Sequence, residues 1–194
     1  MDHPLVPLSA IRVTVFEGHE RGESGEAIPV RVESRVLDKT ERVAGVPARV
    51  VQVHEYEHGE LVERTRDYYA QSRDGNVWYF GEHVDDYKDG KIVGHGGQWF
   101  AGRDGALPGL FMSAQPKVGR TFEQERAPGV AEDRSKVVAV GLDVTTPAGT
   151  FSKCIKTEDY APLDKETEFK YYCAGVGLVR EEPPGGRVDL VRYE

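Results

Sequence analysis

The segment DYYAQSRDGNVWYFGEHVDDYKDGKIVGHGGQW, residues 67–99, decides the fold of this chain. Asp74-Gly75 and Asp89-Gly90 each lie between runs in which aromatic and polar residues alternate. An Asp-Gly pair between alternating runs predicts a β-hairpin, because both residues tolerate the positive φ that a two-residue turn requires. The segment therefore predicts three consecutive antiparallel strands.

The rest of the chain repeats this pattern, with candidate strands at the spacing of about 8–12 residues that is typical of sandwiches and barrels. We expect strands over residues 11–17, 30–39, 48–56, 61–71, 77–86, 91–100, 121–125, 136–145, 150–160, 167–173, 177–181 and 188–193. Residues 102–119 are rich in Gly and Pro and predict a long loop. No long window shows helical periodicity. The prediction is one all-β domain over residues 1–194, built on a single strongly curved antiparallel sheet (a half-barrel or flattened barrel) with few helices.

Charge and hydropathy exclude several classes of partner. A net charge of −8 argues against nucleic-acid binding and against attachment to anionic membranes. No apolar run approaches the roughly 20 residues that span a bilayer. The start, MDHPLVPLSA, lacks the features of a signal peptide. We expect a cytoplasmic protein if Met1 is native, and an extracytoplasmic one if a leader was removed.

The two cysteines, Cys154 and Cys173, flank a predicted hairpin. A turn centred between Leu163 and Asp164 sets them directly opposite each other, near the separation that a disulfide needs. A slip of one residue would turn the thiols to opposite faces. A disulfide and two separate buried thiols are therefore both compatible with the sequence.

The turns also predict which side chains share a face of the sheet. Two-residue turns pair His54 with Glu63, Asp67 with Glu82, and Tyr69 with Phe80. One face then gathers Gln52, His54, Glu63, Thr65, Asp67, Tyr69, Gln71, Trp78, Phe80, Glu82, His95 and Trp99. The opposite face pairs Arg64 with Asp85, as a solvated face would. We therefore place the Trp78/Phe80/Trp99 face toward the interior.

On that face the sharpest feature is Asp67 beside Glu82. Like charges directly opposite each other destabilise a sheet, so one carboxyl is expected to hold a proton with a raised pKa. Such pairs serve general acid/base chemistry or bind a cation, and His95 is close enough to join either role. The alternative is a solvent-exposed face on which Asp67 and Glu82 are ordinary surface charges.

These residues predict a protein that binds a small organic or amphipathic ligand. The predicted ligand-binding residues are His54, Tyr69, Gln71, Trp78, Phe80 and Trp99, and Asp67, Glu82 and His95 orient the polar end of the ligand. The second hypothesis is an enzyme without a cofactor or metal (a cyclase, isomerase or lyase) in which Asp67, Glu82 and His95 are catalytic. A third is a structural or interaction module of the cell envelope.

Several phrases resemble a group of uncharacterised bacterial β-rich proteins. They are ERTRDYYAQSRDGNVWYFGE, WFAGRDGALPG, TTPAGTFSKCIKT and KYYCAGVGLV, and the likeness extends over residues 43–179. The resemblance implies export, often as a lipoprotein, and a fold like that of bacterial lipoprotein carriers. It implies no catalytic residues. The chain departs from the group at its leaderless start and at Cys173-Ala174, where the group tends toward Ala-Pro.

Overall fold

The computed structural model describes residues 1–22 and 24–194 and consists of β-strands, with no helix in these ranges. The strands are β1 (Val13–Arg21), β2 (Ala27–Val43), β3 (Val46–Glu57), β4 (Glu60–Gln71), β5 (Val77–Lys88), β6 (Lys91–Gly94), β7 (Trp99–Phe100), β8 (Gly109–Met112), β9 (Thr121–Glu123), β10 (Arg134–Thr146), β11 (Gly149–Ala161), β12 (Glu166–Cys173), β13 (Gly177–Glu182) and β14 (Arg187–Tyr193). The predicted all-β class is confirmed.

All the strands belong to one antiparallel sheet of 14 strands. Its main path runs β6-β5-β4-β3-β2-β1-β14-β13-β12-β11-β10-β9, and β7 and β8 pair separately with β5. The path has two free ends, and the sheet is neither closed nor strongly curled, so the predicted flattened barrel is wrong. Both end strands are short, with 4 residues in β6 and 3 in β9, and two such edges offer little backbone with which to close a barrel.

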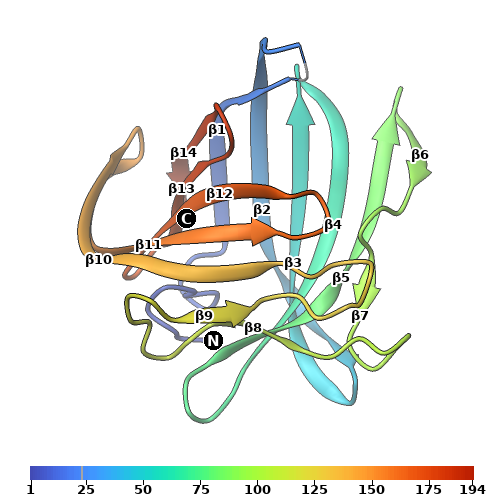
Figure 1. Ribbon diagram of the computed structural model, residues 1–194, viewed down its shortest axis with the longest axis vertical. Coiled ribbons are helices and arrows are strands. Elements are labelled where there is room, and N and C mark those ends of the chain that lie inside the picture. Colours follow the sequence, from blue (N-terminus) through green and yellow to red (C-terminus); the bar gives the residue numbers. More distant parts are fainter. Residues whose placement is uncertain (23) are drawn as a thin grey trace.

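The two halves of the sheet run in different directions. Figure 1 shows the long strands β2–β5 roughly upright, with β9–β12 crossing in front of them. Aromatic packing joins the two halves, because the rings of Phe111, in β8, and Tyr172, in β12, lie 6.3 Å apart in an edge-to-face arrangement. The molecule therefore has an interior between the halves of one continuous sheet.

The predicted strand ranges all overlap observed strands, and two differences stand out. The range 91–100 divides into β6 and β7 around Gly96 and Gly97. The predicted loop 102–119 contains β8, which pairs with β5. A four-residue strand that directly follows Pro108 is too short to show alternation, so the sequence pattern gave no signal for it.

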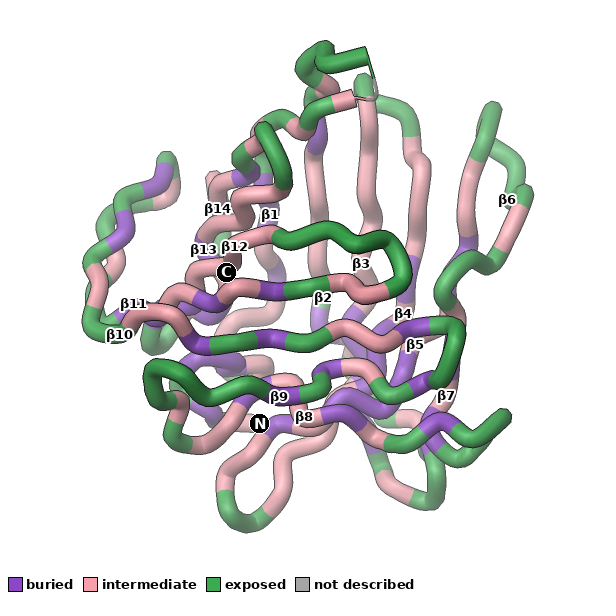
Figure 2. Tube along the Cα trace, viewed as in Figure 1, coloured by how far each residue is buried: buried purple, intermediate pink, exposed green. Residues whose placement is uncertain are grey.

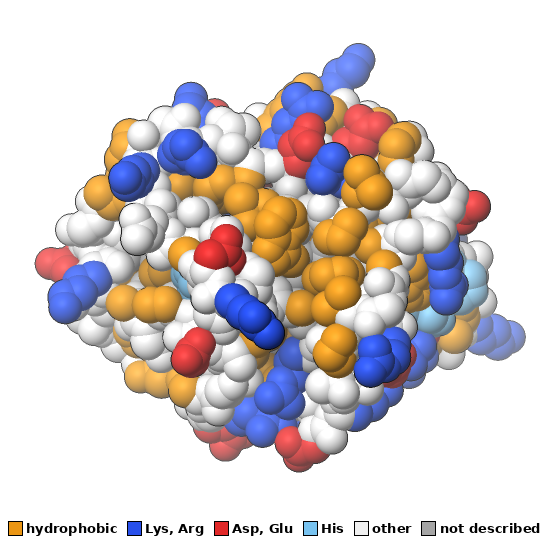
Figure 3. All heavy atoms as spheres, turned by 90° about the horizontal axis from the view of Figure 1, so that it is seen from below, with side chains coloured by type: hydrophobic (Ala, Val, Ile, Leu, Met, Phe, Trp, Pro, Cys, Tyr) orange, Lys and Arg blue, Asp and Glu red, His pale blue; other side chains and the backbone are white. Residues whose placement is uncertain are grey.

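One of the buried clusters lies at the end of the molecule that holds the N-terminal segment. There Leu5 and Val6 of the N-terminal segment join Val77, Met112 and Ile155 in one buried cluster. Figure 3, the view from below, shows hydrophobic side chains gathered at this end. Toward the top of Figure 2 the strands β2–β4 are half-exposed instead, and in β3 every residue from 52 to 57 is intermediate in burial. The space between the halves is therefore filled at one end and less filled at the other.

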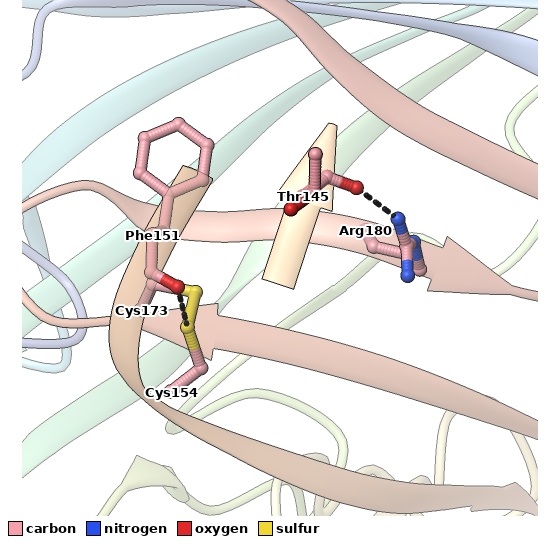
Figure 4. The surroundings of a disulfide bond; sticks show 5 residues. All are labelled: Thr145, Phe151, Cys154, Cys173 and Arg180. Atoms are coloured by element: carbon pink, nitrogen blue, oxygen red, sulfur yellow. Dashed lines mark hydrogen bonds between the residues drawn. A yellow bond between two sulfur atoms is a disulfide. The ribbon is translucent and has the colours of Figure 1, made fainter. Parts of the chain in front are cut away.

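A disulfide joins β11 to β12 (Figure 4). Cys154 lies directly opposite Cys173, with a Cα–Cα distance of 3.9 Å. Ala161 pairs with Glu166 in the same register, so the turn is centred between Leu163 and Asp164 as predicted. Both cysteines are fully buried, beside Val144, Val179 and Val188 among others. The bridged alternative is the one that the structure shows.

Candidate functional site

The pairing of β4 with β5 places the predicted acidic pair as the turn signals suggested. Asp67 lies directly opposite Glu82, and Arg64 lies directly opposite Asp85. The Arg64 Nη2 and Asp85 Oδ2 atoms are 2.6 Å apart, on the other face of the sheet from Asp67. This part of the predicted register is confirmed.

Beyond Glu82 the register shifts at a β-bulge, and the predicted pairing of Tyr69 with Phe80 is wrong. Gly81 adopts a φ of +113°, and a Cβ at this position would lie 2.2 Å from the carbonyl oxygen of Trp99. Because the bulge adds a residue to β5, Tyr69 pairs with Tyr79. Tyr79 therefore shares the face of Asp67, and Trp78 and Phe80 turn to the opposite face. A Gly inside a strand pattern was the available signal.

The β3–β4 hairpin also departs from the predicted register. Its tip is the predicted two-residue turn, since Glu57 pairs with Glu60, but a bulge between Glu55 and Tyr56 shifts the remaining pairs by one residue. Val53 then lies opposite Thr65, where Gln52 was predicted. A register shift of one residue turns every side chain of a strand to the other face. Val51, Val53 and Glu55 therefore line the Asp67 face in place of Gln52 and His54. His54 lies opposite Arg64 on the other face.

His95 and Gln71 lie away from the acidic pair. His95 Nδ1 is 2.6 Å from the Val84 carbonyl oxygen and 3.3 Å from Asp85 Oδ1, so this imidazole belongs to the Arg64/Asp85 face. Gln71 Oε1 accepts a hydrogen bond from the backbone N–H of Asp2 at 3.0 Å. The structure thus separates His95 and Gln71 from the site that the sequence predicted for them.

Trp78, predicted to bind ligand, is engaged on the opposite face. Its Nε1 donates a hydrogen bond to Ser72 Oγ at 3.2 Å, and the ring packs against the cluster that contains Phe80. Of the predicted ligand-binding residues, Tyr69 and Trp99 remain with Asp67 and Glu82.

Around the acidic pair the aromatic neighbours are Tyr69, Tyr79 and Trp99. The Tyr69 and Tyr79 rings stack with their centroids 4.8 Å apart, and Trp99 meets Tyr79 edge-to-face at 5.4 Å. Trp99 also lies directly opposite Glu82. Tyr79 escaped the sequence prediction because the bulge at Gly81 reversed its face. The acid-and-aromatic character of the site was predictable, and one of its three aromatic rings, Tyr79, was not.

A third carboxyl, Glu125, approaches from the segment after β9. The nearby Trp99 indole N–H favours the ionised form of Glu125, but burial and the charge of Asp133 raise the Glu125 pKa to about 7. From sequence, Glu123 and Glu125 have the alternation of a solvated strand, and nothing in their spacing marks Glu125 as interior. The crossing of the two halves of the sheet brings it inside.

Burial controls the protonation of the opposed pair. It raises the pKa of Asp67 to about 7 against the opposing effect of the neighbouring Thr65 hydroxyl. Burial and then the charge of Asp67 raise the pKa of Glu82 to about 9. Asp67 Oδ1 is buried and accepts no hydrogen bond. At neutral pH the pair holds protons that two exposed carboxyls would release.

More carboxyls line the same interior nearer its open end. Burial and the charge of Glu20, on β1, raise the pKa of Glu55, on β3, to about 8. Glu181, on β13, raises the pKa of both Glu20 and Glu55. Since charges influence one another strongly only at short range inside a protein, these three strands direct their carboxyls into one space.

Lys170, on β12, is a cation within this acidic interior, and it is already paired. Its Nζ lies 2.9 Å from Glu168 Oε1 and 3.4 Å from Glu181 Oε1. The side chains of Lys170 and Glu181 lie between the two halves of the sheet, and yet 25% and 22% of their surface remains exposed. That exposed surface faces a cavity.

The cavity has a volume of about 300 Å³. Its wall is mainly apolar and includes Phe16, Val32, Val36, Val51, Val53 and Leu178, together with residues 5–8. Polar groups enter it from Asp67, Lys170 and Glu181, with Tyr69 and Tyr172 beside them. An apolar space with a few polar groups on one side is the usual form of a small-molecule site.

Two further observations concern metals and membranes. Within the parts of the chain that the structure covers, no three His, Cys, Asp or Glu side chains are grouped as ligands for a metal ion. No helix long and apolar enough to cross a bilayer occurs there either.

Comparison with known proteins gives no relative on which to base an assignment. No protein-family model, curated protein or solved structure matches the chain. The resemblance to exported bacterial β-rich proteins rests on the quoted phrases, and the account of function must come from the cavity and its carboxyls.

Proposed function

We propose that this protein binds a small organic or amphipathic ligand between the two halves of its sheet. The observation that supports this most is the cavity of about 300 Å³, with an apolar wall and polar groups from Asp67, Lys170 and Glu181. Tyr69 lines this cavity and keeps its predicted role, whereas Trp99 packs opposite Glu82 outside the cavity lining. The Cys154–Cys173 disulfide favours an oxidising, extracytoplasmic compartment, as in the carrier hypothesis.

Binding of an uncharged fluorescent probe, N-phenyl-1-naphthylamine, tests this proposal. The wild-type protein is expected to enhance the fluorescence of the probe with saturation. Val53→Phe adds a ring to the cavity wall and is expected to weaken probe binding by about tenfold or more, because the ring occupies part of the space that the probe needs. Val93→Phe places the same ring on β6, where residue 93 is 63% exposed, and should leave binding unchanged.

The result that contradicts the proposal is equal probe binding by wild type and Val53→Phe, or no saturable binding by wild type. Thermal melting of both variants shows whether either substitution has unfolded the protein. An intact Val53→Phe fold with lost binding locates the probe in the cavity.

The second candidate function is a cofactor-free cyclase, isomerase or lyase. It is favoured by the Asp67 pKa of about 7, since a general acid or base works best when its pKa is near the working pH. His95 takes no part in this version, because it lies beside Asp85. Asp67→Asn is expected to abolish turnover of a true substrate without lowering the melting temperature. An unchanged rate would reject the hypothesis that the protein is an enzyme.

A further inference from the structure

We propose that the ligand of this cavity is an organic cation, a protonated amine attached to an apolar chain or ring, whose ammonium group binds at Asp67. This inference rests on the proposed function. Its geometric basis is a buried acceptor without a partner: Asp67 is 8% exposed, lines the cavity, and has an Oδ1 atom with no hydrogen bond. A buried polar atom left unpaired is costly, and a donor from a ligand removes that cost.

Two cations line the cavity, and each has a carboxylate partner. Lys170 is held by Glu168 and Glu181, and Arg12 Nη2 lies 2.5 Å from Asp38 Oδ1, while Arg12 Nε has no hydrogen bond. An anion would have to compete with these carboxylates. An ammonium group meets at Asp67 an acceptor that has no partner.

Further carboxyls lie around the cavity. Besides Asp67 and Glu82, the groups that act on one another there are Glu20, Glu55, Glu63, Glu125, Asp133, Asp159, Glu168 and Glu181, with Lys170 among them. The cavity itself is lined by two carboxyls, Asp67 and Glu181, and by two cations, Arg12 and Lys170. The preference for a cation therefore rests on the unpaired Asp67 Oδ1.

The apolar wall defines the rest of the ligand. Val32, Val36, Val51 and Val53 present a continuous aliphatic surface next to Asp67. Such a surface selects an alkyl or aryl body over a hydrated inorganic ion, in agreement with the lack of a metal-ligand group in the described ranges. A ligand with one ammonium group on an apolar body can donate a hydrogen bond to Asp67 and pack its body against the aliphatic wall.

Three ligands with one body and different ends test the inference by calorimetry: 4-phenylbutylamine, 4-phenylbutan-1-ol and 4-phenylbutyrate. The amine is expected to bind about tenfold or more tightly than the alcohol, with the carboxylate weakest, because a hydrogen bond between charged groups is stronger than one between a charged and a neutral group. Equal binding of the amine and the alcohol would overturn the inference that the ligand is a cation, but it would leave the cavity as a ligand-binding site. No binding of any of the three overturns the proposed function as well.

Two variants locate the ammonium. Asp67→Asn is expected to lower amine affinity by about tenfold while leaving alcohol affinity unchanged. Asp143→Asn removes the same unit of charge from an exposed position of β10 and should change neither. If Asp67→Asn weakens amine and alcohol equally, Asp67 has a structural role only and the inference fails. The three-ligand comparison on wild type stands whatever the stability of the variant.

Discussion

At the scale of single residues, a glycine and an acidic pair determine the site. Gly81 allows the chain to pass against the Trp99 carbonyl, and the bulge that results brings Tyr79 to Asp67 and Glu82. The opposed carboxyls have their predicted partners although the connection between β4 and β5 is longer than two residues. Near its tip Gln71 pairs with Val77, and the bulge at Gly81 restores the predicted pairing at Asp67 and Glu82. The aromatic residues between the bulge and the tip are one residue out of the predicted register, so their faces are reversed.

Gly81→Ala is expected to destabilise the protein by roughly 1–3 kcal/mol, because a Cβ would meet the Trp99 carbonyl oxygen at a positive φ. Gly90→Ala is the matched control: its φ is also positive, at +71°, but nothing lies within 4 Å of its Cβ position. Urea unfolding gives both free energies. Equal losses for the two variants would show that the Trp99 contact does not constrain the bulge.

The pKa of Glu82 predicts how stability depends on pH. Because the folded pKa of about 9 lies above the ordinary glutamate value of 4.5, the folded state holds a proton that the unfolded state releases. This contribution to stability is complete below about pH 4.5 and is lost as pH rises toward about 9.

Glu82→Gln is therefore expected to flatten the decline of stability with pH and to add roughly 0.2–1 kcal/mol at alkaline pH, since it removes a like charge opposite Asp67. Glu60→Gln, at an exposed position, is the control. Denaturant unfolding at several pH values measures both variants. A Glu82→Gln profile parallel to that of wild type would contradict the raised pKa.

At the scale of elements, hairpins are the units that sequence patterns describe well. The β11–β12 hairpin has the predicted turn, and its disulfide follows directly from that register. The sequence patterns did not predict β8 or the division of β6 from β7. Strands of two to four residues are too short for an alternation of apolar and polar residues to be detected. These short strands depend on the long β5 for their hydrogen bonds.

Replacing both cysteines, Cys154→Ser with Cys173→Ser, is expected to cost roughly 2–4 kcal/mol of unfolding free energy, because the unfolded chain regains the freedom of a closed loop. The sequence separation of 19 residues sets the size of that loop. Unfolding of the wild type with and without a reductant gives an independent measure. An unchanged midpoint in the reductant would mean that the bridge is absent or contributes nothing.

At the scale of the whole molecule, the arrangement of the two halves of the sheet creates the cavity. Local pattern specifies each strand and its neighbours, but nothing local states that β12 crosses β4 or that Lys170 and Glu125 turn toward Asp67. For this reason the sequence predicted the all-β class and the acidic pair, and it missed the carboxyls that come from the second half. It also predicted a strongly curved sheet, a half-barrel or flattened barrel, where the sheet is open and not strongly curled.

The central claim is that the space between the two halves is the binding site. The most direct test is to titrate 15N-labelled protein with 4-phenylbutylamine and follow the backbone amide signals by NMR. If the ligand binds in this space, saturable shifts are expected for Val51, Val53 and Asp67 on one half and for Lys170 on the other. Shifts confined to the opposite face around Asp85, or no saturable shifts at all, would contradict it.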